Sequence, residues 1–336
     1  MNDMNCQVRL ANRPEGLPAD SDWTISKEAI PTPAEGEFLL GVIYLSLDPA
    51  MRGWMRDARS YIEPVEIGAV MRALGLGKVI ASNHPGYKVG DHVSGMTGVQ
   101  QYVVSDGKGM QKVDPALAPL PTYLSTLGMP GLTAYFGLLD VGLPKEGETV
   151  VVSAASGAVG AVVGQIAKIK GCRTVGIAGG ADKCRYLIDE LGYDAAIDYK
   201  NEDMAEGLKR TCPKGLDVYF DNVGGPMLDS VLGRIKFGAR IVVCGAISQY
   251  NASKEDFYGP KNYLALLVNR ARMEGMVVFD YIKRYREAAM EMGGWMMQGK
   301  LKSREHIDTG IENFPNSLRK LFNGENFGKL ILKVDE

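Results

Sequence analysis

The sequence is poor in cysteine and histidine. Its 336 residues include five cysteines and three histidines. The cysteines are Cys6, Cys172, Cys184, Cys212 and Cys244, which do not cluster. An odd and scattered set argues against a disulfide scaffold and is typical of a reducing compartment. We therefore expect a cytoplasmic protein.

An excess of charge of one sign is also lacking. The chain has 38 basic and 40 acidic residues, for a formal net charge of -2, so no basic field attracts nucleic acid or an anionic membrane. Residues 1–20 lack the apolar core of a signal peptide. The uncharged stretch 149–167 opens with β-branched residues and continues through small ones, which favours a buried strand and a helix over a membrane span. We expect small-molecule partners, with neither nucleic acid nor membrane.

From about Pro130 onward, short β-branched runs alternate with helical segments, which is typical of a doubly wound parallel sheet. The predicted strands are Thr149–Ser153, Thr174–Ala178, Ala195–Asp198, Asp217–Asp221, Arg240–Val243 and Met276–Phe279. The predicted helices are Val159–Lys170, Lys183–Leu191, Met204–Thr211, Met227–Ile235 and Tyr263–Asn269, followed by a long one over Tyr281–Met297.

The region before it has a different pattern. Between Phe38 and Val104, short alternating runs such as Phe38–Tyr44 and Gly77–Ala81 are separated by turn residues. This pattern predicts a β-rich domain. The strand-like run Leu330–Val334 at the end of the chain could return to that domain.

A glycine-containing turn directly follows the strand Thr149–Ser153 and opens a helix. In the dinucleotide fingerprint G-x-G-x-x-G, Gly157 and Gly160 supply the last two glycines and Ala155 replaces the first. Gly157 would let the backbone approach a pyrophosphate, and Gly160 would let the helix pack closely on the strand. Tight packing alone is the alternative explanation of this pattern. We predict that the helix start offers its N–H groups to phosphates.

The end of the second strand, Ala178–Gly180, lacks the acidic residue with which NAD enzymes hold the adenine ribose. Lys183 and Arg185, with Tyr199 and Lys200 after the third strand, could instead surround a 2′-phosphate. Asp182 is a competing ribose acceptor, and an exposed helix face is the alternative for the two basic residues. This region predicts NADPH rather than NADH.

Ligands for zinc are scarce. Structural zinc needs clustered cysteines, and catalytic zinc needs cysteine and histidine from the first domain. Between Cys6 and Cys172 there is no cysteine, and His84 and His92 stand beside turn residues. His306 is expected to be solvated. We predict no metal. Without a Lewis acid, a conjugated double bond accepts hydride more readily than an unactivated ketone.

Long motifs connect the chain to a known family. They are Tyr44–Pro49, Gly128–Tyr135, Asp221–Gly225, Cys244–Asn251 and Asn326–Lys329. With the glycine turn, they resemble the zinc-free leukotriene B4 dehydrogenase/prostaglandin reductase branch of the medium-chain dehydrogenase/reductase superfamily, which includes plant double-bond reductases and bacterial curcumin reductase. The likeness covers nearly the whole chain. At Ala50 this chain departs from the family, which commonly has tyrosine there.

The resemblance implies an α/β chain with two domains. A GroES-like β-rich catalytic domain would comprise residues 1–125 and 300–336, and a Rossmann domain with a doubly wound parallel sheet would comprise residues 126–299. A homodimer is the family expectation, formed by pairing of the edge segment Arg272–Phe279.

The resemblance also implies the cofactor, NADPH/NADP+, and its contacts. These are Gly157, Ala158, Val159, Gly160, Lys183, Tyr199, Asn222, Cys244, Gly245, Ala246, Ile247, Ser248, Tyr250 and Asn326.

Tyr250 is the candidate catalytic residue, because it follows a parallel strand at the edge of the sheet where ligands bind. It could hold the nicotinamide ribose, donate to a carbonyl oxygen or protonate the α-carbon; an ordinary loop tyrosine is the alternative. We predict reduction of the C=C bond of α,β-unsaturated ketones and aldehydes. Quinone reduction within the same superfamily, or NADPH binding without turnover, are the alternative functions.

Overall fold

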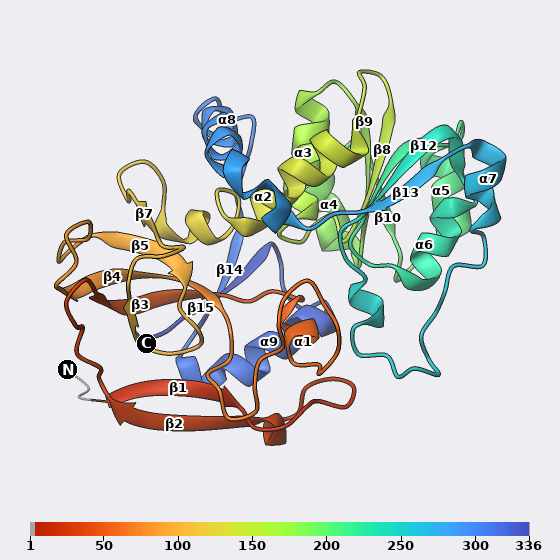
Figure 1. Cartoon of the computed structure of the whole chain (residues 1–336). Coiled ribbons are helices and arrows are strands. Elements are labelled where there is room, and N and C mark those ends of the chain that lie inside the picture. The colour runs from red at the N-terminus through yellow and green to blue at the C-terminus, as the bar shows by residue number, and fades with distance from the viewer. Residues whose placement is uncertain (1–3, 336) are drawn as a thin grey trace. The chain divides into compact units, whose positions relative to one another are not determined.

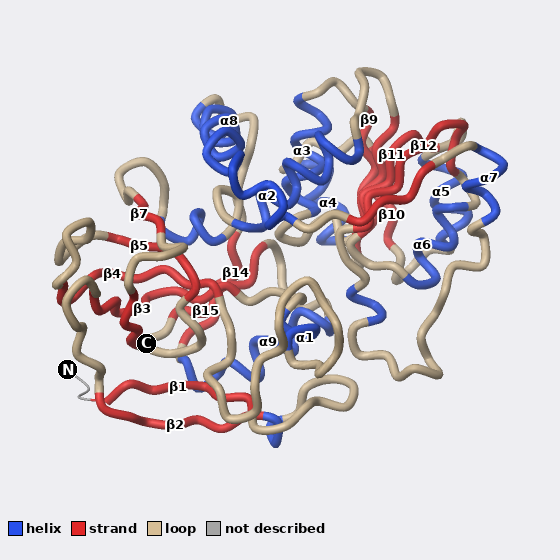
Figure 2. Tube along the Cα trace, viewed as in Figure 1, coloured by secondary structure: helices blue, strands red, loops and turns tan. Residues whose placement is uncertain are grey.

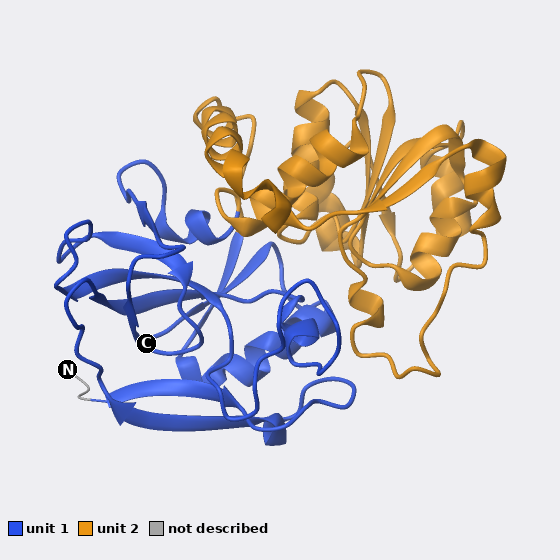
Figure 3. Ribbon diagram, in the orientation of Figure 1, with its two compact units in different colours: residues 1–125, 305–336 blue, residues 126–304 orange. Residues whose placement is uncertain are grey.

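The computed structural model describes residues 4–335 and divides the chain into two compact units. Unit 1 comprises residues 1–125 and 305–336, and unit 2 comprises residues 126–304 (Figure 3). The chain therefore leaves unit 1 once and returns to it for its last strands.

Unit 1 is rich in β-structure (Figures 1 and 2). A two-stranded sheet pairs β1 (Met4–Leu10) with β2 (Trp23–Ala29). A second sheet has the order β14-β15-β3-β4-β5-β7, with β6 also paired to β3. Its strands are β3 (Phe38–Ser46), β4 (Leu74–Ser82), β5 (His92–Met96), β6 (Tyr102–Ser105), β7 (Gln111–Val113), β14 (Glu305–Thr309) and β15 (Lys329–Lys333).

The α-helices in the described part of unit 1 are α1 (Met51–Trp54) and α9 (Phe314–Asn323). Helix α9 is amphipathic, and its buried residues include Phe314 and Leu318. The Phe314 ring meets Trp23 edge to face, with 5.1 Å between ring centroids. A residue near the end of the chain therefore closes the core formed by its beginning.

Unit 2 is a doubly wound sheet. Its strand order is β10-β9-β8-β11-β12-β13, and every neighbouring pair is parallel. The strands are β8 (Thr149–Ser153), β9 (Arg173–Ala178), β10 (Ala195–Asp198), β11 (Leu216–Asp221), β12 (Ile235–Val243) and β13 (Arg272–Gly275). This is the Rossmann order: strands β8 to β10 are added toward one edge of the sheet and strands β11 to β13 toward the other, so the strand order reverses between β8 and β11.

Helices cover both faces of this sheet (Figure 1). On one face lie α3 (Gly160–Ile169) and α4 (Ala181–Asp189); on the other lie α5 (Met204–Thr211), α6 (Gly225–Leu232) and α7 (Leu264–Asn269). Helices α2 (Met129–Phe136) and α8 (Tyr285–Met297) also belong to this unit. All five residues of β8 are buried, which explains why its three central residues are all valine.

The last predicted strand was wrong. Met276–Phe279 is not a strand; the sixth strand is β13, at Arg272–Gly275. Its partner β12 ends at Val243, opposite Gly275, so later residues have no strand to pair with. Met276 and Val278 are apolar because they are buried in the core, not because they extend the sheet.

Several helix boundaries also differ from the prediction; helix α4, for example, begins at Ala181 rather than Lys183. Residues 278–284 form a 3₁₀ helix, so the long α-helix begins at Tyr285 rather than Tyr281. Helix α6 ends at Leu232, and Ile235 already belongs to β12.

Candidate functional site

The turn after β8 is compact because Ala154 is left-handed and Gly160 has no side chain. Ala154 adopts a left-handed conformation, with φ of 47°, and its carbonyl oxygen accepts the N–H of Gly157 at 2.9 Å. A Cβ at Gly160 would lie 2.4 Å from the same carbonyl oxygen. Only glycine at position 160 lets α3 start this close to the strand.

The first N–H groups of this helix are open. Within residues 4–335, the backbone N–H groups of Ala158, Val159 and Gly160 have no hydrogen-bond acceptor, whereas Ala161 already donates to Gly157. Three such groups at a helix start, aided by the helix dipole, form an anion site.

Basic and aromatic side chains gather at the end of β9. A Cβ at Gly179 would lie 2.9 Å from the Tyr199 ring and 3.0 Å from the side chain of Lys200. Burial and the nearby charge of Lys200 lower the pKa of Lys183. An ammonium group whose charge is disfavoured in this way is suited to bind a phosphate.

Arg185 and Asp182, the two residues whose roles the sequence left open, pair with each other. Their ion pair lies on the exposed face of α4, with side chains 71% and 87% exposed. The acid at this edge of the sheet is instead Asp198, which accepts the N–H of Gly180 at 2.7 Å and that of Lys200 at 3.2 Å. Asp198 therefore shapes the turns that carry the basic residues.

The end of β11 carries Asn222. Its backbone N–H donates to the Ser153 hydroxyl at 2.8 Å, and its side-chain amide donates to the Ser153 carbonyl at 2.7 Å. The preceding residue, Asp221, is a buried carboxyl whose pKa is raised by burial. The ends of β8 and β11 are thus tied together at the edge of the sheet where ligands bind in this fold.

The segment from Cys244 to Tyr250 lies against that turn. Ile247 donates its N–H to the Asn222 carbonyl at 3.1 Å, and Ser248 donates both its N–H and its hydroxyl to the Val223 carbonyl. The Tyr250 hydroxyl accepts the N–H of Ala246 at 3.2 Å. A phenol hydroxyl is chemically both an acceptor and a donor.

The Cys244 thiol has low reactivity. Its burial and the nearby Asp221 carboxyl raise its pKa to about 12. Since the thiolate is the nucleophilic form, the Cys244 sulfur is a weak nucleophile.

The predicted residue Asn326 belongs to unit 1, apart from the other candidates, which all belong to unit 2. It lies between α9 and β15, and its side-chain amide donates to the Gly328 carbonyl at 3.0 Å. The candidates of unit 2 thus lie at one edge of its sheet, whereas Asn326 lies in the loop between α9 and β15 of unit 1.

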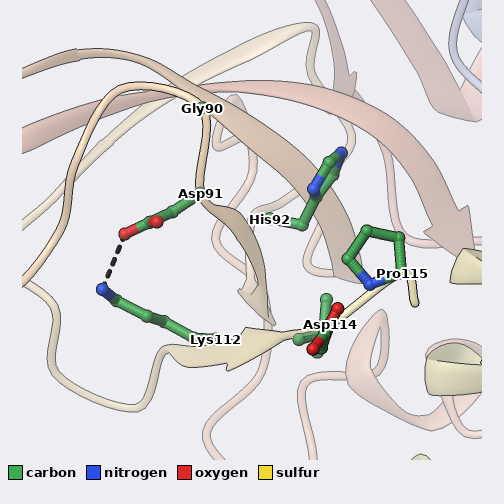
Figure 4. A pocket seen from close by; sticks show the side chains of 7 residues that line it. Gly90, Asp91, His92, Lys112, Asp114 and Pro115 are labelled. Carbon is green, nitrogen blue, oxygen red and sulfur yellow. Dashed lines mark ion pairs between the residues drawn. The ribbon is translucent and has the colours of Figure 1, made fainter. Parts of the chain in front are cut away.

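Unit 1 has a surface hollow beside β5 and β7 (Figure 4). Its lining includes His92 and Asp114, and an ion pair of 2.7 Å joins Asp91 to Lys112.

Across residues 4–335, no three His, Cys, Asp or Glu side chains are grouped to hold a metal ion. The same residues include no helix that is long and apolar enough to cross a bilayer.

Sequence reasoning missed three supporting residues: Ser153, Asp198 and Asp221. Each is the last residue of a parallel strand. A polar residue in that place, at the end of an otherwise apolar run, was the available signal.

Comparisons with known proteins agree across nearly the whole chain. Residues 6–113 match the model described as the N-terminal domain of oxidoreductase, and residues 158–293 match the model described as zinc-binding dehydrogenase. The NADPH-dependent curcumin reductase of Escherichia coli is 46% identical, covering 97% of this chain and 95% of that protein. The NADP(+)-dependent 2-alkenal reductase of Nicotiana tabacum is 43% identical, covering 98% and 97%.

A solved structure is similarly close. CurA from Vibrio vulnificus, in complex with NADPH, superposes with a TM-score of 0.93 at 48% identity. The match covers 98% of this chain and 99% of that one.

Proposed function

Because the chain belongs to the zinc-free enone reductase branch of the medium-chain dehydrogenase/reductase superfamily, we propose that it reduces the C=C bond of α,β-unsaturated ketones and aldehydes with NADPH. The observation that carries this proposal is whole-length identity above 40% to a curcumin reductase and a 2-alkenal reductase. The chain is an NADP-dependent oxidoreductase, and its substrates are small conjugated carbonyl compounds.

The residues of unit 2 fit NADPH. The open N–H groups of Ala158, Val159 and Gly160 receive the pyrophosphate. Lys183, with Tyr199 and Lys200 beside it, receives the 2′-phosphate, because charge-assisted bonds to phosphate are strong. Asn222 and the segment 244–250 receive the nicotinamide end. In unit 1, Asn326 is a further proposed contact.

When bound, NADPH supplies a hydride, which a conjugated alkene accepts at its β-carbon. Negative charge then develops on the carbonyl oxygen of the substrate. The Tyr250 hydroxyl donates a hydrogen bond to that oxygen, and the bond strengthens as the charge grows. We assign unit 1 the substrate contacts, among them the turn at Ala50. Where the family commonly has tyrosine, this position has only a methyl group, which is half-buried against the core of unit 1.

We also propose a cytoplasmic homodimer. All five cysteines are free, and three of them are buried, which suits a reducing compartment. Strand β13 is an edge of the unit 2 sheet. Nearby, Phe237, Leu267 and Val268 expose large apolar side chains, and such a surface invites a second copy.

Product analysis tests the reaction. Incubated with NADPH and an α,β-unsaturated ketone, the protein should yield the saturated ketone with its carbonyl intact. The allylic alcohol as main product would show that hydride reaches the carbonyl carbon instead. Quinone turnover exceeding that of every enone in a panel would move the protein to quinone reduction.

A further inference from the structure

Asp221 is a buried carboxyl at the end of β11 that the proposed mechanism does not use. It is 1% exposed. One of its oxygens, Oδ1, accepts four hydrogen bonds: from the hydroxyls of Tyr219 at 2.9 Å and Ser153 at 3.1 Å, and from the N–H groups of Val223 and Gly224 at 3.0 Å each. The other oxygen, Oδ2, is buried with no partner in the described chain.

A buried carboxyl such as that of Asp221 is less favourable in a protein core than an apolar side chain. Burying a carboxyl disfavours its charged form and weakens the fold unless its bonds compensate. The four donors come from three places: the end of β8, β11 itself and the turn into α6. Asp221 therefore fixes the relative position of these segments, which an apolar residue of similar size could not do.

Other residues depend on that position. The Asp221 carbonyl accepts the N–H groups of Cys244 at 2.9 Å and Gly245 at 3.1 Å. Ser153, which donates to the Asp221 carboxylate, also holds both amide groups of Asn222. One residue thus connects Asn222 with the start of the segment 244–250.

We propose that Asp221 is a positioning residue for the cofactor: it holds Asn222 and the segment 244–250 in the arrangement that receives NADPH. The inference rests on the proposed function, in which these residues contact the nicotinamide end. A contact surface that is already ordered loses less entropy on binding, so its affinity is higher.

The test is NADPH affinity, measured by calorimetry on the whole chain. Asp221→Ala should raise the Kd roughly ten- to a hundredfold, because four donors lose their acceptor and the turn relaxes. Asp221→Asn should raise the Kd less than Asp221→Ala does, because its amide oxygen remains an acceptor for two of the four donors. In an Asn222→Ala background, the effect of Asp221→Ala should shrink at least about threefold, as expected for coupled residues.

Asp217, on the same strand, provides a matched control. It lies near the opposite end of β11, where its Oδ2 accepts the N–H of Thr149 at 2.8 Å and the ammonium of Lys236 at 2.7 Å. Asp217→Ala also removes a carboxylate that connects neighbouring strands. It should lower the melting temperature and leave the NADPH Kd unchanged.

A wild-type Kd in Asp221→Ala, or equal losses of affinity in both alanine variants, would overturn the proposal. If Asp221→Ala does not fold, Ser153→Ala serves as the test variant instead. We expect it to raise the NADPH Kd about tenfold, and a wild-type Kd in this variant would overturn the inference. Asn222→Ala alone tests the proposed function separately, because wild-type affinity there refutes the Asn222 contact whatever Asp221 does.

Discussion

At the residue scale, cofactor choice depends on one ammonium group. Lys183 is half-buried, and the nearby Lys200 disfavours its charge, so a phosphate placed there relieves a repulsion. Lys183→Ala should raise the Kd for NADPH about ten- to a hundredfold, the effect of one charge-assisted bond of roughly 1.5–3 kcal/mol. Binding of NADH should barely change.

Arg185→Ala is the matched control for this prediction. Arg185 lies two residues further along the same helix and is paired with Asp182 on an exposed face. Its removal should leave both affinities nearly unchanged. Equal losses for NADPH and NADH in Lys183→Ala would show that Lys183 supports the fold rather than the 2′-phosphate.

Tyr250 is the residue that we expect to act on the substrate. Removing its hydroxyl in Tyr250→Phe takes away a donor to the developing enolate, which should lower kcat/KM roughly ten- to a thousandfold. It also leaves the N–H of Ala246 without its acceptor, a loss of about 1 kcal/mol in stability. Single-turnover hydride transfer with saturating NADPH separates the two effects.

Tyr258→Phe controls for the loss of a tyrosine hydroxyl in the same region. The Tyr258 hydroxyl donates to Asp229 at 2.9 Å and has no proposed role in turnover. This variant should transfer hydride at the wild-type rate. If Tyr250→Phe does so too, with NADPH binding intact, Tyr250 is only a loop tyrosine.

At the element scale, the strands of unit 2 could be predicted well where burial decided them. Residues 149–153 and 195–198 are strands with the predicted bounds. The sixth strand was missed because β13 is a polar edge strand, with none of its four residues buried. Met276 and Val278, just after β13, are apolar because they are buried in the core and not because they form a strand. Periodicity reports burial, and burial coincides with a strand only where both faces are covered.

The candidate site could be predicted from sequence only in part, for a similar reason. Gly160 stands in a pattern whose spacing reflects one local geometry, so it was found directly. The carboxylate of Asp221 and the hydroxyl of Ser153, which donates to it, belong to residues that are 68 positions apart in the chain. Local patterns hold no information about such pairs, so only the folded sheet shows that they meet.

In unit 1, an ion pair brings together two motifs that the sequence kept far apart. The ammonium of Lys329, on β15, is buried and donates to the Leu47 carbonyl and to Asp48, both at 2.7 Å. The Ser46 hydroxyl, at the end of β3, donates to the same carboxylate at 2.5 Å. The pair therefore continues the contact between β3 and β15 beyond their last backbone pairing.

We expect Asp48→Asn to destabilise the protein by about 3–5 kcal/mol, because it leaves the buried ammonium without its counter-charge. The double variant Asp48→Asn/Lys329→Met should recover most of that loss, since an uncharged pair of similar volume pays little desolvation. Urea unfolding followed by circular dichroism measures both. A single variant as stable as wild type would mean that solvent screens the pair completely.

At the scale of the whole molecule, the apolar surface around β13 predicts self-association. Helix α7 has no buried residue, and Leu267 and Val268 are 74% and 66% exposed. Phe237, on the adjacent strand β12, is 72% exposed. A short edge strand beside such a surface offers both unpaired backbone groups and apolar area, which are the two elements of a sheet-extending dimer.

Leu267→Asp should therefore weaken the dimer. A carboxylate in the apolar part of an interface costs about 2–4 kcal/mol, roughly a thirty- to a thousandfold rise in the dimer Kd. Sedimentation velocity over a concentration series measures this change. Leu117→Asp is the control, because Leu117 is 80% exposed in unit 1, away from β13 in the chain, and its charge should leave the dimer intact. A wild-type protein that sediments as a monomer throughout the series would refute the dimer, and equal weakening by both variants would place the interface elsewhere.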